Sequence, residues 1–401
     1  MRKIYLFTFM MLLLVHLKGQ AQQITLHVER AGTLHGMINA SRLPYITDLK
    51  LTGELNGTDI SFIRTLVKKN LRFLDLSEAR IVEGGAIYYS NYRTSNDIIG
   101  SYMFYNPNYS PISPCAISKI NLPNSVTGIE EGAFKSCTRL TDINIPNSVT
   151  SIGPETFKSC TSLTDINIPN SVTSIGEQAF SGCTSLTDIN IPDAVKSIEP
   201  ETFSGCTRLT DINIPNSVTS IGYEAFYNCT RLTDINIPNS VTSIERSTFY
   251  SCTGLTSINI PGSVTTIGSN AFYSCTSLTD INIPNSVTSI GEQAFYNCDN
   301  LKSVYMNAST PPFIGSQAFH NISKDLTIYI PRGSYTAYWL SYWGNYNLVE
   351  YDPTDIQGVT TSAHNGVEKY FSIDGRPLPG PCKGVNIIQD TDGKTRKAWI
   401  P

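Results

Sequence analysis

Apolar and polar residues follow one fixed period through most of this chain. The copy at residues 163–185 reads L-T-D-I-N-I-P-N-S-V-T-S-I-G-E-Q-A-F-S-G-C-T-S, and this 23-residue pattern recurs from Leu140 to Asn300. Its T-D-I-N-I segment alternates polar and apolar residues, which predicts a short strand with both isoleucines inside and the aspartate and asparagine outside. Proline has no amide hydrogen for a strand ladder, so Pro169 should end the strand.

The second half of each copy predicts a turn on the opposite side. Pro154 and Pro200 occupy the position that Glu177 holds in another copy. Because proline favours the first residue of a helix, a short helical or 3-10 turn should begin there. The glycine just before it, such as Gly176, is replaced by glutamate in three other copies. We therefore expect an ordinary turn, without a backbone conformation that only glycine adopts.

A period of 23 residues with an L-x-x-I-x-I core is a leucine-rich-repeat signature. One copy leaves two apolar faces uncovered, so the copies must stack in order to fold. The predicted fold is a repeat solenoid with short parallel strands on the concave face and short helical or 3-10 turns on the convex face. Its structural core should contain Phe157, Phe180, Phe203 and Phe226, and Cys137, Cys160, Cys183, Cys206, Cys229, Cys252, Cys275 and Cys298.

The cysteines mark the repeat without a slip in phase. Eight of the ten occupy one position of successive copies, unlike the irregular spacings of small disulfide-stapled domains. Identical side chains on adjacent strands also fit the dihedral angle of a disulfide poorly. We expect these eight to be free buried thiols. Cys115 and Cys382 lie outside the column, and the sequence leaves open whether they pair.

The first 21 residues have the features of a secretory signal peptide. Arg2 and Lys3 precede an apolar run at residues 4–15 that is too short to span a bilayer, and a small-residue cleavage site ends at Ala21. We predict a mature chain that is secreted, extracellular or on the outer cell surface and has no transmembrane segment. The signal holds three bases and no acid, so its loss changes the formal charge from −4 to −7, which argues against nucleic acid as a partner.

The rest of the chain divides into four predicted parts. They are a divergent N-terminal leucine-rich-repeat and cap region with a tyrosine-rich insertion (22–116), the regular solenoid with a C-terminal cap (117–350), a linker (351–365), and a short C-terminal β tail (366–401). In the cap, Tyr335, Tyr338, Trp339 and Trp343 crowd into one segment and are interpreted as a plug over the last copy.

The tyrosine-rich insertion has two interpretations. It contains Tyr88, Tyr89, Tyr92, Tyr102, Tyr105 and Tyr109. One interpretation is a loop that packs on the flank of the solenoid. The other is a contact patch for a protein or glycan, because tyrosine offers a large amphipathic area at low entropy cost.

Several phrases of the sequence resemble a known family. The A-F and C-T-x-L phrases of the repeat, with the segments 51–59 (L-T-G-E-L-N-G-T-D) and 74–77 (L-D-L-S), are similar to the BspA-like leucine-rich-repeat surface proteins over about residues 25–350. The resemblance implies a secreted or surface-exposed bacterial protein. Some members of the family are adhesins for host matrix proteins, so it also implies a role in adhesion. The tail 366–401 resembles C-terminal modules of exported Bacteroidetes-type proteins, which implies a sorting or anchoring role, although it is shorter than usual.

No catalytic, metal or cofactor motif is found in the sequence. The histidines that remain after signal removal are His27, His35, His320 and His364, and none stands at metal-ligand or triad-like spacing. No phosphate-binding glycine loop is present either. The sequence therefore predicts a protein that is not an enzyme and needs no cofactor.

The outward residues of the predicted strands are the candidate ligand-binding site. They form two columns on the concave face, Asp142, Asp165, Asp188, Asp211, Asp234 and Asp280, interrupted by Ser257, and Asn144, Asn167, Asn190, Asn213, Asn236, Asn259 and Asn282. Like charges at strand spacing repel, so a basic protein segment, a glycan or calcium are possible ligands. The alternative is a solvated acidic stripe whose asparagines hydrogen-bond along the stack.

These features favour a non-enzymatic surface protein that mediates protein–protein or cell adhesion through the concave face. Near-identical copies suit repeated weak contacts with an extended partner, where avidity matters more than any single site. The alternative is a surface component that binds glycans or nutrients through the tyrosine-rich insertion. The oligomeric state is left open.

Overall fold

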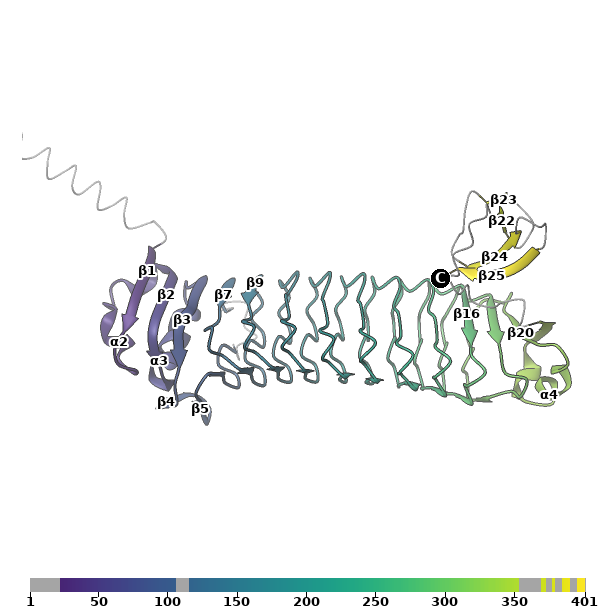
Figure 1. Ribbon diagram of the computed structural model, residues 1–401, viewed down its shortest axis with the longest axis horizontal. Helices are drawn as coiled ribbons and strands as arrows, with labels where there is room; N and C mark the ends of the chain where they lie inside the picture. Colours follow the sequence, from purple (N-terminus) through teal and green to yellow (C-terminus); the bar gives the residue numbers. More distant parts are fainter. Residues whose placement is uncertain are drawn as a thin grey trace, which may run out of the picture.

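The computed structural model describes residues 22–105, 115–352, 369–372, 377–378, 384–389 and 395–400. Strands β1 to β21 follow one another along a long, nearly straight stack of turns (Figure 1). Short parallel strands dominate this stack, which confirms the predicted repeat solenoid. The predicted signal peptide, Tyr109 and Cys382 lie outside the described residues, as does most of the predicted linker.

One parallel ladder contains the strands that the alternation predicts. Its ordered strands are β1 (Gln22–Val28), β2 (Ile46–Leu55), β3 (Phe73–Ile81), β7 (Lys119–Asn121) and β9 (Asp142–Asn144) at one end, and β16 (Asp280–Ile283), β18 (Ser303–Met306), β20 (Thr327–Pro331) and β21 (Asn347–Tyr351) at the other. In the copies between, single parallel bridges such as Asn190 to Asn213 continue the ladder. Equivalent residues of neighbouring copies therefore stand side by side.

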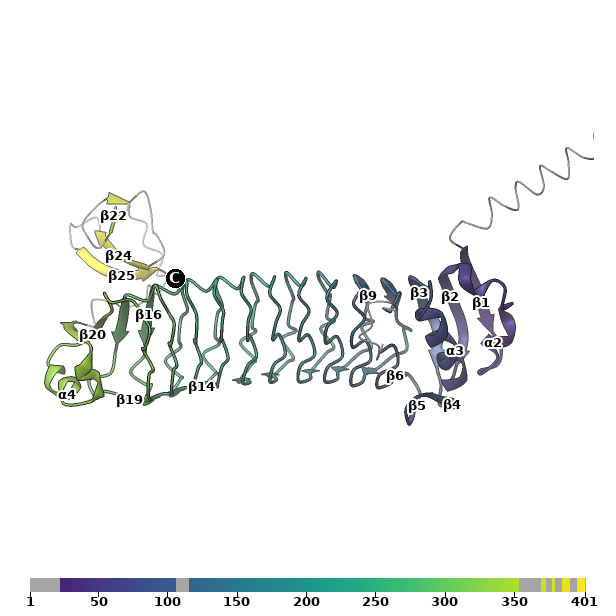
Figure 2. The same cartoon turned by 180° about the vertical axis from the view of Figure 1, so that it is seen from behind.

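A second parallel ladder, which the sequence analysis does not predict, follows another side of the rod (Figure 2). It consists of three successive parallel sheets. The first contains β6 (Ile98–Ile99), β8 (Gly128–Ile129), β10 (Ser151–Ile152) and β11 (Ser174–Ile175), the second β12 (Ser197–Ile198) and β13 (Ser220–Ile221), and the third β14 (Ser243–Ile244), β15 (Thr266–Ile267), β17 (Ser289–Ile290) and β19 (Phe313–Ile314). Two residues per copy are too few to show an alternating pattern.

The segment of each copy that was predicted to lie on the convex face is a series of single turns. The amides of Lys158 and Cys160 donate to the carbonyls of Glu155 and Phe157, three residues earlier, which is 3-10 spacing. The backbone has positive φ at Glu155 and at Ser159. Because these residues reverse the chain direction, the turns do not join into a continuous helix.

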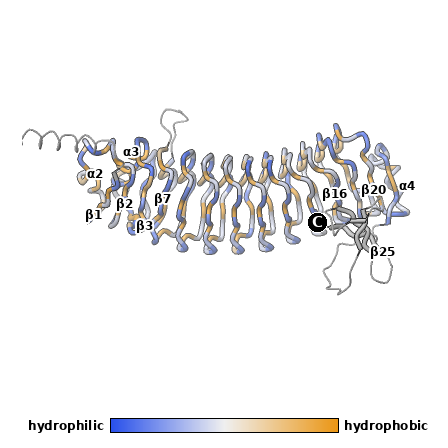
Figure 3. The backbone as a smooth tube through the Cα atoms, turned by 90° about the horizontal axis from the view of Figure 1, so that it is seen from above, coloured by the Kyte–Doolittle hydropathy of each residue, from blue (hydrophilic) through white to orange (hydrophobic). Residues whose placement is uncertain are grey.

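Columns of phenylalanine and cysteine side chains follow the core of the rod, beside buried leucine, isoleucine and valine columns. The phenylalanine rings from Phe104 to Phe319 stack with nearly parallel planes, at centroid separations from 4.8 to 5.7 Å. Each repeat cysteine donates to a phenylalanine carbonyl of the preceding copy, as Cys183 Sγ does to Phe157 O at 3.2 Å. Hydrophobic positions accordingly recur along every turn of the tube in Figure 3.

All nine described cysteines are buried free thiols, as predicted for the eight in the column. Burial raises the pKa of the Cys183 thiol to about 12, because a thiolate there would have no water around it. Cys115 also lies in the core, with its sulfur 3.4 Å from that of Cys137 and no disulfide between them.

The glycine position in the convex turn is more constrained than the sequence indicates. Gly176 has an ordinary φ, as expected, but a Cβ built on it would lie 2.4 Å from the backbone nitrogen of Pro154 in the preceding copy. The same crowding occurs at Gly153 and Gly291. Close approach between copies, rather than backbone conformation, therefore favours glycine at these positions, whereas other copies have Glu130, Glu199 or Glu245 at the same place.

The N-terminal end carries α2 (Leu34–Met37), the 3-10 helix η1 (Leu43–Tyr45) and α3 (Gly57–Val67). Asn56 and Asp59 form a capping box at the start of α3. The buried Asp59 carboxylate also accepts a hydrogen bond from the Leu34 amide at 2.9 Å. One acidic side chain thus joins α2 to α3. The hairpin of β4 (Gly84–Tyr89) and β5 (Tyr92–Thr94) follows β3.

The C-terminal end carries α4 (Tyr335–Trp339) and the 3-10 helix η2 (Tyr342–Asn345). Tyr338 and Trp343 are fully buried against the last copy, which confirms their role as a plug. The plug interpretation is wrong for Tyr335 and Trp339, which are 43% and 56% exposed. Only one side of α4 faces the stack, so its other aromatic residues face solvent.

The tail forms its own antiparallel sheet. Its strands are β22 (Lys369–Ser372), β23 (Pro377–Leu378), β24 (Gly384–Gln389) and β25 (Thr395–Ile400), in the order β23-β22-β24-β25. Short strands joined by turns were predicted for this segment. Antiparallel pairing distinguishes the sheet from the parallel ladders of the rod.

Candidate binding surface

The two polar columns of the predicted strands lie side by side along the rod, and we call them the Asp–Asn ladder. The exposed members are Asp142, Asp165, Asp188, Asp211, Asp234, Asn144, Asn167, Asn190, Asn213, Asn236 and Asn259. The alternating isoleucines between them, such as Ile166, are buried. The strand alternation therefore places these side chains in solvent, in one register, on one face, whereas Asp280 and Asn282 at the end of the two columns are only partly exposed.

Neighbouring threonines hold the backbone of this face together. The Thr187 hydroxyl donates to the Thr164 carbonyl at 3.1 Å, and the Thr187 amide donates to the same carbonyl at 3.0 Å. The same hydroxyl bond recurs along the column in later copies, for example from Thr256 to Thr233. The threonines thus serve the stack, whereas the aspartate carboxylates beside them point outward.

The ladder has different surroundings at its two ends. Lys119 Nζ lies 2.7 Å from Asp142 Oδ2, so the first carboxylate is paired with a base. Asp280 at the other end is only partly exposed, and its Oδ1 atom is buried without a described hydrogen-bond partner. Burial raises the pKa of the Asp280 carboxyl. The structure therefore separates Asp142 and Asp280 from the other predicted acidic residues.

The central carboxylates form the accessible acidic part of the face. Asp165, Asp188 and Asp211 are exposed, and none of them makes an ion pair with another described residue. Beyond Asn282 the asparagine column is replaced by Tyr305 and Tyr329, whose rings stack at 4.7 Å. The polar surface is consequently bounded by a base at one end and an aromatic pair at the other.

The tyrosine-rich insertion forms a second, partly exposed cluster. Tyr89, Tyr92, Tyr102 and Tyr105 have neighbouring ring centroids 5.4 to 6.5 Å apart. Beneath them, the buried Arg64 guanidinium lies 4.7 Å from the Tyr89 ring centroid and donates to the Tyr102 carbonyl at 2.8 Å. The insertion thus packs on the flank of the solenoid, and its tyrosines remain partly exposed.

A third aromatic feature, which the strand alternation does not predict, follows one column of the later copies. Tyr227, Tyr250, Tyr273 and Tyr296 stack at 4.7, 4.5 and 5.0 Å, and His320 continues the stack at 5.5 Å. Earlier copies have lysine or serine at this position. The change from lysine or serine to tyrosine at this one position of successive copies is the sequence signal for the stack.

The described residues contain neither a metal-binding cluster nor a membrane-spanning helix. Within the described residues, no three histidine, cysteine, aspartate or glutamate side chains come together as a metal site. In that same part of the chain, no helix is long and apolar enough to cross a membrane.

Comparison with solved structures finds similar leucine-rich-repeat proteins. A leucine rich cell surface protein from Faecalibacterium prausnitzii is 28% identical, with 67% of this chain and 86% of that chain covered and a TM-score of 0.38. A leucine-rich-repeat protein of T. pallidum is 28% identical over 46% of this chain and 72% of that one, with a TM-score of 0.32. One from Bacteroides ovatus is 24% identical over 70% and 92%, with a TM-score of 0.30.

No curated protein matches the chain. The model of the BspA type leucine rich repeat region matches six copies, over residues 97–233 and 219–338. These residues make up more than half of the chain and include the whole Asp–Asn ladder. The protein therefore belongs to the BspA-type leucine-rich-repeat family.

Proposed function

We propose that this protein is a secreted, non-catalytic surface protein that mediates adhesion by binding another extracellular protein through the Asp–Asn ladder. BspA-type members are cell-surface proteins, and leucine-rich-repeat domains generally bind proteins. The observation that carries the proposal is the row of exposed carboxylates at Asp165, Asp188 and Asp211, which no described base neutralises.

Charge and geometry together define the partner. Carboxylates repeated at strand spacing repel one another, and a basic segment that crosses several copies would relieve that repulsion. The asparagine column beside them offers carboxamides that both donate and accept hydrogen bonds. A partner with an extended segment rich in lysine or arginine fits both columns, and contacts at several copies add through avidity.

The test removes charge from the ladder without changing side-chain size. The mature chain with Asp165→Asn, Asp188→Asn and Asp211→Asn is compared with the parent for binding to a panel of immobilised extracellular-matrix proteins. We expect the dissociation constant of the bound protein to rise by about tenfold or more. Binding of the parent should also weaken as salt is raised, because exposed charges are screened.

A matched control removes three acids outside the ladder, one in the copy at residues 163–185 and two in the copy at residues 278–300. Glu177→Gln, Glu292→Gln and Asp299→Asn change the net charge by the same amount at exposed positions. Equal loss of binding in both triple variants would indicate a net-charge effect, and unchanged binding in the ladder variant would refute the proposal.

A second candidate function is binding of a surface glycan or nutrient by the tyrosine-rich insertion. It is supported by the partly exposed cluster of Tyr89, Tyr92, Tyr102 and Tyr105. Polysaccharide binding that is lost in Tyr92→Ala and kept in the ladder variant would favour this function. Polysaccharide binding that Tyr92→Ala leaves unchanged would oppose it.

A further inference from the structure

The last full copy of the solenoid departs from the repeat at one point. Ile283 is paired with Met306, 23 residues later, whereas Ser289 is paired with Phe313, 24 residues later. One extra residue therefore lies between Met306 and Phe313. This segment contains Pro311 and Pro312, and no other copy of the repeat has two consecutive prolines.

In the regular copies a serine bonds across this edge to the preceding copy, except in the copy that has Ala194 at this position. The Ser286 hydroxyl donates to the Val264 carbonyl of the preceding copy at 2.6 Å, and Ser263 makes the same bond to Val241. In the copy with the extra residue, no described side-chain hydroxyl reaches the corresponding carbonyl of Val287. The edge bond that joins neighbouring copies is missing here.

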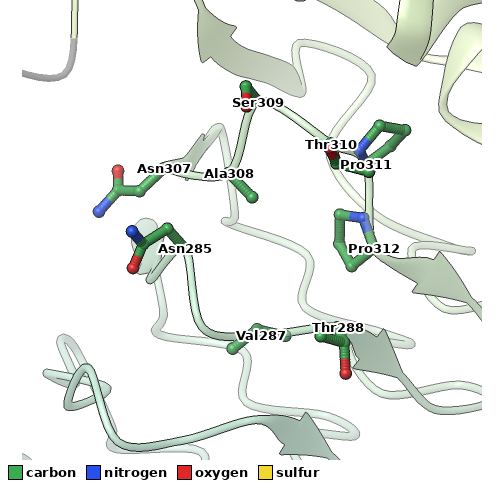
Figure 4. Close-up of a pocket in the computed structure, with 9 residues that line it drawn as sticks. All are labelled: Asn285, Val287, Thr288, Asn307, Ala308, Ser309, Thr310, Pro311 and Pro312. Atoms are coloured by element: carbon green, nitrogen blue, oxygen red, sulfur yellow. The ribbon is translucent and has the colours of Figure 1, made fainter.

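A cavity of 480 Å³ takes the place of that bond. Figure 4 shows the carboxamides of Asn285 and Asn307 side by side at one end and the rings of Pro311 and Pro312 at the other, with Val287 between them. Its volume lies within the range of about 300 to 1,000 Å³ typical of small-molecule sites.

The C-terminal cap holds the outer wall of the cavity from behind. The Tyr351 hydroxyl donates to Asn307 Oδ1 at 2.7 Å, the Tyr338 hydroxyl to the Ala308 carbonyl at 2.7 Å, and Trp343 Nε1 to the Pro312 carbonyl at 2.9 Å. Tyr338 and Trp343 are fully buried. Three fixed contacts along one short loop preorganise the wall, which lowers the entropy cost of binding.

The chemistry of the lining specifies the ligand. No charged side chain lines the cavity, so a neutral ligand fits best. The Asn285 carboxamide and the Ser309 and Thr310 hydroxyls donate and accept hydrogen bonds, and none of them has a described partner. The proline rings supply an apolar surface opposite. Hydroxyl groups around a compact apolar ring match this arrangement.

We propose that the cavity at residues 285–312 binds one neutral sugar unit. Asn285 and the hydroxyls of Ser309 and Thr310 recognise the sugar hydroxyls, and the Pro311 and Pro312 rings cover its apolar face. An extended peptide fits less well, because the Ser286 bond to Val264 closes the equivalent space in the adjoining copy. The site lies in a later copy than the ladder carboxylates Asp165, Asp188 and Asp211.

Ligand-observed saturation-transfer NMR on the mature chain tests the proposal. The probes are the methyl glycosides of glucose, galactose, mannose and N-acetylglucosamine, with methyl glucuronide as the charged probe and a blocked alanine tripeptide as the peptide probe. We expect transfer to at least one neutral glycoside, with affinity reduced by about tenfold in Asn285→Ala. Thr310→Trp, at an exposed position, should fill the cavity and abolish transfer.

The repeat provides a matched control. Asn239→Ala makes the same change at the equivalent exposed position of a regular copy, where the Ser263 hydroxyl donates to the Val241 carbonyl. Its affinity should stay within about twofold of the parent. Absence of transfer to all four neutral glycosides, equal effects of Asn285→Ala and Asn239→Ala, or stronger binding of the tripeptide would each overturn the proposal. Transfer that Tyr92→Ala abolishes would instead assign the sugar to the tyrosine cluster.

Discussion

At the scale of single residues, each cysteine of the repeat contributes a buried proton as well as volume. The Cys183 thiol donates to a main-chain carbonyl and has no exposed surface, so burial raises its pKa to about 12. In the unfolded chain a cysteine titrates near pH 8.5. The folded state therefore keeps protons that the unfolded state loses in mildly alkaline solution.

This difference predicts that the rod loses stability as the pH rises. A pKa raised by folding gives stability that is complete below the unfolded pKa, near 8.5, and is lost toward the folded pKa. Each such thiol should lower the free energy of unfolding by about 1.4 kcal/mol per pH unit in that window. Urea denaturation midpoints between pH 7.5 and 10.5, in reductant, measure the effect. Cys183→Ala should have a shallower pH dependence, and an unchanged slope would contradict the thiol assignment.

Substitution of two glycines by alanine distinguishes the effect of crowding between copies from the effect of lost backbone flexibility. In Gly176→Ala the new Cβ would meet the backbone of Pro154 at 2.4 Å, whereas Gly262→Ala meets no atom within 4 Å. We expect Gly176→Ala to destabilise the protein by about 1 to 3 kcal/mol through overpacking, and Gly262→Ala to change it by no more than about 0.5 kcal/mol. Denaturation midpoints compare the two. A Gly176→Ala protein as stable as the parent would show that neighbouring copies can separate without cost.

At the scale of elements, the C-terminal cap contains aromatic residues that are buried against the last copy and others that are exposed. Trp343 in η2 is fully buried and donates to the Pro312 carbonyl, whereas Trp339 in α4 is 56% exposed. A solenoid leaves the apolar face of its last copy uncovered. Trp343 and Tyr338 cover it, and the exposed aromatic residues of α4 add nothing to that cover.

Substitution of each tryptophan by alanine should therefore change the stability of the protein by very different amounts. Trp343→Ala should lower stability by about 3 to 5 kcal/mol, since it removes a large buried side chain, and should leave the Pro312 carbonyl without its donor. Trp339→Ala should have little effect. Hydrogen exchange locates the change, and protection in Trp343→Ala should be lost first in β18 and β20. Uniform loss along the rod would argue against a local capping role.

Some of these elements follow from the sequence and others depend on neighbouring copies. The alternation around Ile166 and Ile168 is enough to place the Asp and Asn columns in solvent. The pairing of Asp142 with Lys119 and the burial around Asp280 depend on divergent copies at the two ends, which the consensus does not describe. Cap aromatics likewise cannot be sorted by residue type, because the direction in which α4 packs decides which of them are buried.

At the scale of the whole molecule, near-identical copies make the rod a sum of nearest-neighbour contacts. Backbone bridges, phenylalanine stacking and cysteine bonds each join one copy to the next, as between Asn190 and Asn213. A partner that spans several copies therefore meets the same surface repeatedly. Stability and binding should both depend on how many copies remain in phase.

Deletion of one full period tests this dependence. Removal of residues 186–208 joins Ser185 to Leu209 and keeps every column in register, because the next copy supplies the same residue types. We expect this variant to fold with circular dichroism like that of the parent and a melting temperature within a few degrees. An unfolded product would show that stability is not built from nearest-neighbour contacts.

A second deletion variant, which removes 22 residues instead of 23, tests whether the phase of the repeat matters. Deletion of residues 186–207 leaves Arg208 as an extra residue between Cys183 and the next buried leucine, where the regular chain makes an i to i+3 turn, as in the bond from Leu186 N to Cys183 O at 3.0 Å. This insertion falls between two buried side chains, so it must displace one of them. The extra residue near Pro311 lies in a partly exposed edge loop instead and leaves the core columns in register. We therefore expect the 22-residue deletion to melt well below the 23-residue deletion, and equal melting temperatures would show that phase does not matter to the stack.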